Sequence, residues 1–202
     1  MTRTGREANS KGMSTAPSRP ASTPRLSARL ITLMGALFAL GVAQGALVYL
    51  QRSPVLEAQV ADTDGWAVHA VLAVVVAVVA LAVAIRRRRL GRRGSALLLP
   101  VGEKAARRVR LTVRQRPRPW WRLGAAVLPT ILLLYGPIRA GEQIIAGLDP
   151  NFTVNAWGGP GYLGAMACHY LDTLVMMAVA AWLLDRILLP DRACTAADRS
   201  VD

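Results

Sequence analysis

The sequence predicts an all-α integral membrane protein, a four-helix bundle that follows a disordered basic N-terminal arm. Hydrophobic residues make up 53% of the 202 residues although the formal net charge is +13, so apolar and charged residues must be separated along the chain. The apolar residues form continuous runs that can cross about 30 Å of hydrocarbon at about 1.5 Å per residue. Strands are disfavoured because the runs are continuous rather than alternating.

Four apolar runs are expected to become membrane-spanning helices. Their approximate bounds are 30–50, 66–85, 123–145 and 161–184. The first run exceeds the apolar part of a signal peptide, about 7–15 residues, which favours an uncleaved helix. The second is rich in valine, but a backbone in lipid must satisfy its own hydrogen bonds, and this overrides a weak helix propensity. The third contains Pro129 and Pro137, each of which removes a backbone donor and should kink the helix.

Charge sets the expected orientation. The disordered arm, residues 1–28, and the adjoining Arg29 together hold six Lys or Arg residues, and the loop 86–122 holds fourteen. The connecting segments 51–65 and 139–160 hold one each. Because loops rich in Lys and Arg stay in the cytoplasm, we expect a bacterial plasma-membrane protein with both termini cytoplasmic. The transmembrane domain is then residues 29–190, and a cytoplasmic tail, 191–202, follows it.

Asp172 is the most informative residue, because it falls inside the fourth run. Counting from its outer end at about 1.5 Å per residue places the carboxyl roughly 16 Å deep. An aspartate there costs about 2.5–3.5 kcal/mol, so it should face the bundle interior. His169 precedes it by three residues and lies on the same helical face. The two could form a proton relay, half of a metal site or one lining of a polar cavity, or a hydrogen-bonded pair that only fixes helix packing.

Arg139 and Glu142 have the same spacing near the outer end of the third run. One interpretation is an interfacial ion pair in which Arg139 extends outward. The other turns Arg139 inward toward Asp172, helped by the backbone break at Gly136-Pro137, so that both helices line a polar pocket that opens to the outside.

His69 and Gln44 are weaker candidates. His69 and His169 together raise the possibility of a haem held by two histidines, but their estimated depths, about 5 Å and about 12 Å, disagree. We therefore expect a hydrogen-bonded interfacial His69, and no cofactor or metal. Gln44 lies between Gly41 and Gly45, whose spacing favours close packing inside the bundle, and it should hydrogen-bond to a neighbouring helix.

Each of two connecting segments has two interpretations. The turn-rich stretch 151–162 suits a tight entry into the last helix, and it could also cap an outward pocket or dock a partner. Residues 102–114, within the loop 86–122, are expected to form a short basic helix on anionic lipid headgroups, or to supply only the charge that sets topology. Nucleic acid is excluded as a partner, because the arginines flank apolar runs and no zinc-ligand spacing or phosphate-binding loop occurs.

These features predict a small accessory or assembly subunit of a membrane complex, in contact with the lipid bilayer and with a membrane-protein partner or a second copy. The alternative is a small transporter or proton-coupled membrane enzyme that uses the intramembrane pair His169 and Asp172. The sequence holds no motif that pairs a nucleophile with a base, which favours a non-enzymatic role.

Overall fold

The computed structural model describes residues 26–62, 65–91, 98–115 and 120–190. Four helices in it are long and apolar enough to span a membrane, and two shorter helices join them, which confirms the predicted all-α membrane bundle. The long helices are α1 (Ala28–Leu50), α2 (Trp66–Arg89), α4 (Trp120–Ala146) and α6 (Tyr162–Ile187). The short ones are α3 (Glu103–Arg114) and α5 (Pro150–Thr153). Most of the predicted arm and all of the predicted tail, 191–202, lie outside the described residues.

Each long helix extends a little beyond its predicted run. α2 continues through Arg86–Arg89, because arginine is a good helix former and its charge is favourable in a last helical turn. α4 begins at Trp120, and it continues through Pro129 and Pro137 as a single helix.

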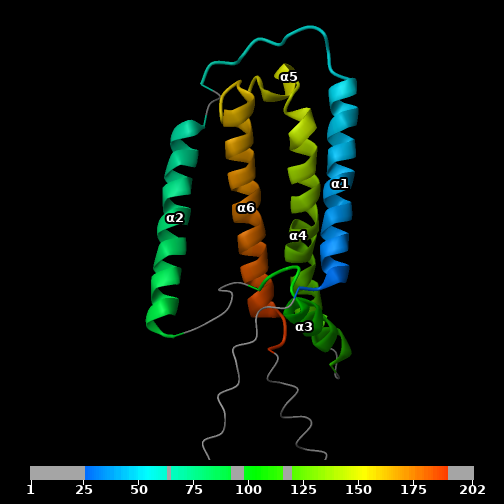
Figure 1. Cartoon of the computed structure of the whole chain (residues 1–202), viewed down its shortest axis with the longest axis vertical. Helices are drawn as coiled ribbons and strands as arrows, with labels where there is room; N and C mark the ends of the chain where they lie inside the picture. The colour runs from blue at the N-terminus through cyan, green and yellow to red at the C-terminus, as the bar shows by residue number, and fades with distance from the viewer. Residues whose placement is uncertain (1–25, 63–64, 92–97, 116–119, 191–202) are drawn as a thin grey trace, which may run out of the picture.

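The long helices stand in the order α2, α6, α4, α1 (Figure 1). α1 lies against α4 along much of its length through glycines. A Cβ atom added to Gly45 would lie 2.1 Å from the carbonyl oxygen of Glu142, and one added to Gly141 would lie 2.2 Å from that of Phe38. Close backbone approach of this kind provides the van der Waals contact that associates helices in lipid. The predicted role of the α1 glycines in packing inside the bundle is confirmed.

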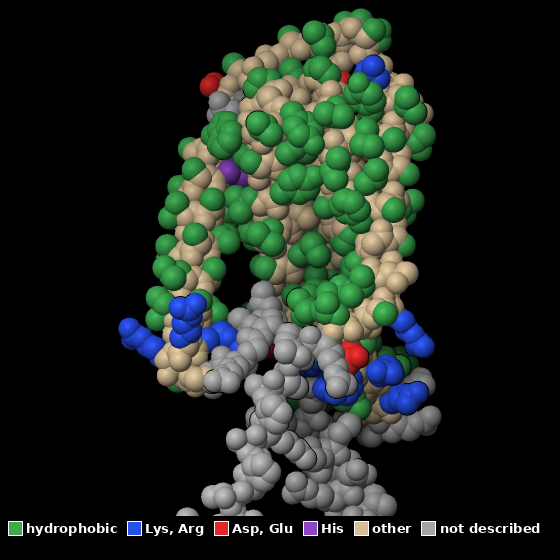
Figure 2. Space-filling view, in the orientation of Figure 1, with side chains coloured by type: hydrophobic (Ala, Val, Ile, Leu, Met, Phe, Trp, Pro, Cys, Tyr) green, Lys and Arg blue, Asp and Glu red, His purple; other side chains and the backbone are tan. Residues whose placement is uncertain are grey.

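α2 stands apart from the other helices. On the face toward α6, His69 is buried and Leu72 and Val76 are half-buried, whereas Ala80 and Val83, the next residues of the same face, are exposed. Figure 2 shows the open space that separates the lower part of α2 from the rest of the molecule. α2 is therefore attached to the bundle at one end only.

The bundle has two chemically different ends. We call the end that carries Arg86–Arg89 and α3 the arginine end, and the opposite end, which carries α5, the α5 end (Figures 1 and 2). At the arginine end, α3 buries the face formed by Ala105, Arg108 and Thr112. The predicted basic helix at 102–114 is thus confirmed, while its binding to lipid headgroups stays a prediction.

Arg108 attaches α3 to the end of α6. Its Nε donates to the carbonyl of Leu189 at 2.8 Å, its Nη2 donates to the carbonyls of Asp185 and Leu188 at 2.7 Å each, and its Nη1 pairs with the Asp185 carboxylate. Thr112 Oγ1 accepts from the backbone N–H of Leu189 at 3.1 Å. The last carbonyls of a helix have no partner within it, so this one arginine supplies donors that α6 itself lacks.

At the α5 end, residues 51–62 connect α1 to α2 by crossing the other helices (Figure 1). Two asparagines hold this crossing segment. Asn151 Oδ1 accepts from the N–H of Glu57 at 2.9 Å, and its Nδ2 donates to the carbonyl of Val55 at 2.8 Å. Asn155 Oδ1 accepts from the N–H of Val60 at 2.9 Å. The amides therefore replace the backbone partners that an extended segment would find in a sheet.

Candidate functional site

A polar pocket of about 440 Å³ lies at the α5 end, between α4, α6 and the residues of α5 and its following loop. Its lining consists of Arg139, Asn151, Phe152, Asn155, Ala156, Trp157, His169 and Asp172. Three of these residues, Arg139, His169 and Asp172, are candidates that the sequence predicts. The structure brings all three to one cavity, as the inward-turned interpretation of Arg139 requires.

The loop after α5 is positioned by close glycine contacts. A Cβ atom added to Gly158 would lie 1.8 Å from the carbonyl oxygen of Gly164, and Gly159 has a φ of +79°, a conformation that favours glycine. The N–H of Gly65, just before α2, donates to the carbonyl of Trp157 at 2.6 Å. The loop thereby ties the first turn of α2 to the first turn of α6.

His69 reaches from α2 to Asp172 of α6. Its Nε2 lies 3.2 Å from Asp172 Oδ2, and its Nδ1 lies 2.9 Å from the carbonyl oxygen of Gly65. The imidazole packs on the Trp157 ring with centroids 5.4 Å apart. The His69 side chain is 5% exposed and that of Asp172 is 40% exposed, so only the carboxyl faces the pocket openly. His69 is a histidine with both ring nitrogens engaged, as expected.

This contact depends on one proton. The Gly65 carbonyl only accepts hydrogen bonds, so Nδ1 of His69 must carry a hydrogen. Nε2 then either donates to an ionised Asp172 or accepts from a protonated one. If that proton is removed, two lone pairs face each other and the hydrogen bond is lost. The α2–α6 contact is therefore linked to proton binding at this pair.

The estimated depths of these residues need correction. Counting from each helix start places His69 and Asp172 about 11 Å apart along the membrane normal, whereas the structure has them in contact. The count is wrong because it starts both helices at the same level. Figure 1 shows that the first turns of α6 extend beyond the start of α2.

Asp172 is bonded to His69 of α2 rather than to His169, within the part of the chain that the structure describes. His169 nevertheless shares the pocket with Asp172, and so the two do lie on one face of α6. His169 thus contributes a second imidazole to the same cavity.

Arg139 and Glu142 form the expected ion pair, with Nη1 of Arg139 2.9 Å from Glu142 Oε2. Gln44 of α1 donates to the other carboxylate oxygen, Oε1, at 3.2 Å, which confirms the predicted hydrogen bond from Gln44 to a neighbouring helix. The guanidinium also lies over the Phe152 ring, 6.0 Å from its centroid. Arg139 therefore lines the pocket, and Glu142 links the Arg139 guanidinium to Gln44 of α1.

Asn151 and Asn155 are structural residues of the site that the sequence interpretation missed as individuals. Asn151 lies in the first turn of α5 and Asn155 in the turn that follows the helix, and both amides bond to the crossing segment. The side chain of Asp149 accepts from the N–H of Asn151, which begins α5. An Asp-Pro-Asn sequence followed by a second asparagine four residues later is the signal that could have found them.

Comparison of the chain with protein-family models, curated proteins and solved structures finds no match. The site is therefore interpreted from its own chemistry. Arg139 supplies a positive charge, His69, His169 and Asp172 supply groups that exchange protons, and the aromatic rings supply a wall. Within the described residues, no group of three or more His, Cys, Asp or Glu side chains is placed to hold a metal ion.

Proposed function

We propose that this multi-pass membrane protein is an accessory or assembly subunit that receives a transmembrane helix of a partner between α2 and α6. The observation that carries the proposal is the one-ended attachment of α2. Its contact with α6 depends on His69 and the two turns that follow, and from Ala80 onward the same face is uncovered. On α6, Val179 lies two turns beyond Asp172 on the same face and is 49% exposed.

The chemistry of these two faces suits a helix rather than a polar ligand. Ala73, Ala77, Ala80 and Ala84 recur at helical spacing along α2. Small side chains let a neighbouring helix approach closely, and close van der Waals contact drives helix association in lipid. A partner helix in this space would contact α2 and α6 together.

A bulky side chain on the uncovered face tests this proposal. Ala80→Phe should block the partner helix, while Ala82→Phe changes the same residue type on the opposite face, 200° away at 100° per residue. We expect wild type and Ala82→Phe to retain one companion, another protein or a second copy, through purification in mild detergent, and Ala80→Phe to lose it at unchanged abundance. Equal retention by both variants, or a wild-type chain that purifies as a monomer, would refute the proposal.

A second function, a small transporter or a proton-coupled membrane enzyme, is favoured by the polar pocket. Its Arg139, His169 and Asp172 lie among helices in which charged groups are costly and commonly functional. In liposomes with an imposed membrane potential, proton entry that is lost in Asp172→Asn would favour this function over assembly. The companion experiment separates the two, because a role in transport alone leaves the companion unaffected in Asp172→Asn and His169→Ala.

A further inference from the structure

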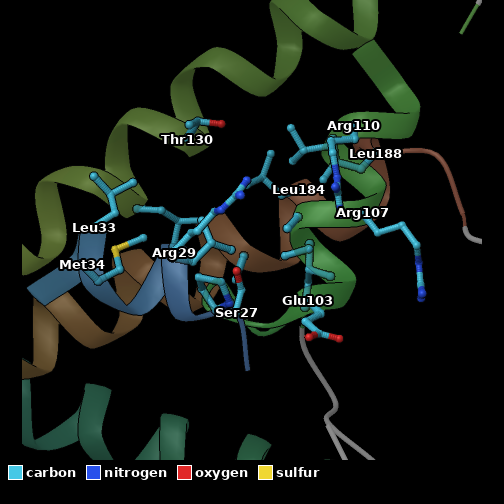
Figure 3. A pocket seen from close by; sticks show the side chains of 18 of the residues that line it. Ser27, Arg29, Leu33, Met34, Glu103, Arg107, Arg110, Thr130, Leu184 and Leu188 are labelled. Atoms are coloured by element: carbon cyan, nitrogen blue, oxygen red, sulfur yellow. The ribbon is translucent and has the colours of Figure 1, made fainter. Parts of the chain in front are cut away.

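A larger cavity, about 930 Å³, lies at the arginine end. It is lined by the first turns of α1, by α3 and the residues before it, and by the halves of α4 and α6 near that end (Figure 3). It is distinct from the polar pocket, since the two share no residue.

One part of this cavity is apolar. Its wall is formed by Leu33 and Met34 of α1, Leu133 and Leu134 of α4, and Leu184 of α6. Leu133 and Leu184 also belong to the buried core, at 5% and 7% exposure. The wall is thus continuous with the part of the bundle that spans hydrocarbon.

The other part is basic. Arg29 of α1 and Arg107 and Arg110 of α3 line it, against the single carboxylate of Glu103 (Figure 3). Arg29 and Arg110 are exposed, and neither has an ion-pair partner among the residues that the structure describes. Arg108, by contrast, is committed to the end of α6. Of the α3 arginines, Arg108 therefore binds the end of α6, whereas Arg107 and Arg110 line the cavity.

We propose that this cavity binds one anionic phospholipid. The headgroup phosphate lies between Arg29 and Arg110, and an acyl chain lies along Leu33, Met34 and Leu134. Basic pockets between transmembrane helices recognise anionic headgroups in this way, because charge and hydrocarbon are matched at the same depth. A free phosphate would leave the apolar wall uncovered, and a zwitterionic lipid would place its own cation beside the arginines.

Native mass spectrometry of the full chain in neutral detergent tests the site. Phosphatidylglycerol and phosphatidylcholine with identical acyl chains are added in turn. We expect one phosphatidylglycerol per chain to be retained, and phosphatidylcholine to be lost. The double variant Arg29→Gln/Arg110→Gln should weaken phosphatidylglycerol binding about tenfold, since each arginine near an anionic headgroup contributes a several-fold gain in affinity.

Two controls keep the proposal open to refutation. Arg114→Gln removes one arginine charge from an exposed position of α3 that does not line the cavity, and it should leave binding unchanged. Excess inorganic phosphate should not displace the lipid. Equal retention of both lipids, equal weakening by Arg114→Gln and the double variant, or displacement by phosphate alone would each overturn the assignment. Arg29 and Arg110 are both exposed, so we expect the double variant to fold normally. An unchanged melting temperature of the double variant in detergent would show that lost binding does not come from a folding defect.

Discussion

Gly41 of α1 lies so close to Ile138 of α4 that a Cβ atom added to the glycine would be 1.9 Å from the Ile138 carbonyl oxygen. The partner atom belongs to the backbone and has no rotamer by which to move away. The two helices therefore meet at a distance that only a glycine permits.

Gly41→Ala should separate α1 from α4 and destabilise the bundle by about 1–3 kcal/mol, the usual cost of overpacking a tight contact. Gly35→Ala in the same helix is the control, because a Cβ atom there meets nothing within 4 Å. Thermal melting of both purified variants in detergent measures the difference. Equal melting temperatures would contradict the close contact.

Arg108→Ala should loosen the junction between α3 and α6. The substitution leaves the carbonyls of Leu188 and Leu189 without the side-chain donor, at about 1–3 kcal/mol for unsatisfied buried acceptors. Arg114→Ala removes an exposed arginine from the same helix and should have little effect. Hydrogen exchange of the last turn of α6 is the measurement, and unchanged protection in Arg108→Ala would contradict this role.

Asp172→Asn should keep α2 attached, because an amide N–H can donate to Nε2 of a neutral His69. Asp172→Leu cannot donate and should release α2. Spin labels at the exposed positions Leu81 and Leu174, in a background without Cys168 and Cys194, report the separation of the helices by pulsed electron resonance. We expect a narrow distance distribution for wild type and Asp172→Asn and a broad one for Asp172→Leu. A narrow distribution in all three would show that the pair does not hold α2.

The orientation has a simple chemical test, because the chain has two lysines, Lys11 and Lys104, both in segments predicted to be cytoplasmic. An impermeant amine reagent should label neither lysine in intact cells and should label them in opened membranes. Gln59→Lys places an amine in the exposed segment at the α5 end and should be labelled in intact cells. Labelling of Lys104 in intact cells would contradict the predicted orientation and favour the opposite one.

The fold was largely predictable because lipid imposes a simple rule on sequence. Long uncharged runs must be helices, and the runs that contain His69, Asp172 and Pro137 were all recognised by length alone. The close approach at Gly45 followed from the spacing of small residues, and the bond from Gln44 to Glu142 followed from the cost of leaving an amide unpaired in lipid.

The partner of Asp172 was not predictable by the same reasoning. Spacing within a helix identifies neighbours such as His169, but the relative height of two helices depends on the loops that join them. Here the contacts of Trp157 with Gly65 and of Gly158 with Gly164 set that height. A loop conformation of this kind is decided by backbone approach, for which apolar periodicity carries no information.

The junction between α3 and α6 bears on how the chain is made. Arg108 precedes Leu188 by 80 residues, so the ribosome synthesises the arginine first. When the final helix enters the bilayer, the group that terminates it is already present on the nascent polypeptide. We therefore expect biogenesis of the last span to depend on a residue that is translated before it, so that a mutation near the middle of the reading frame acts on residues 185–189, close to its end.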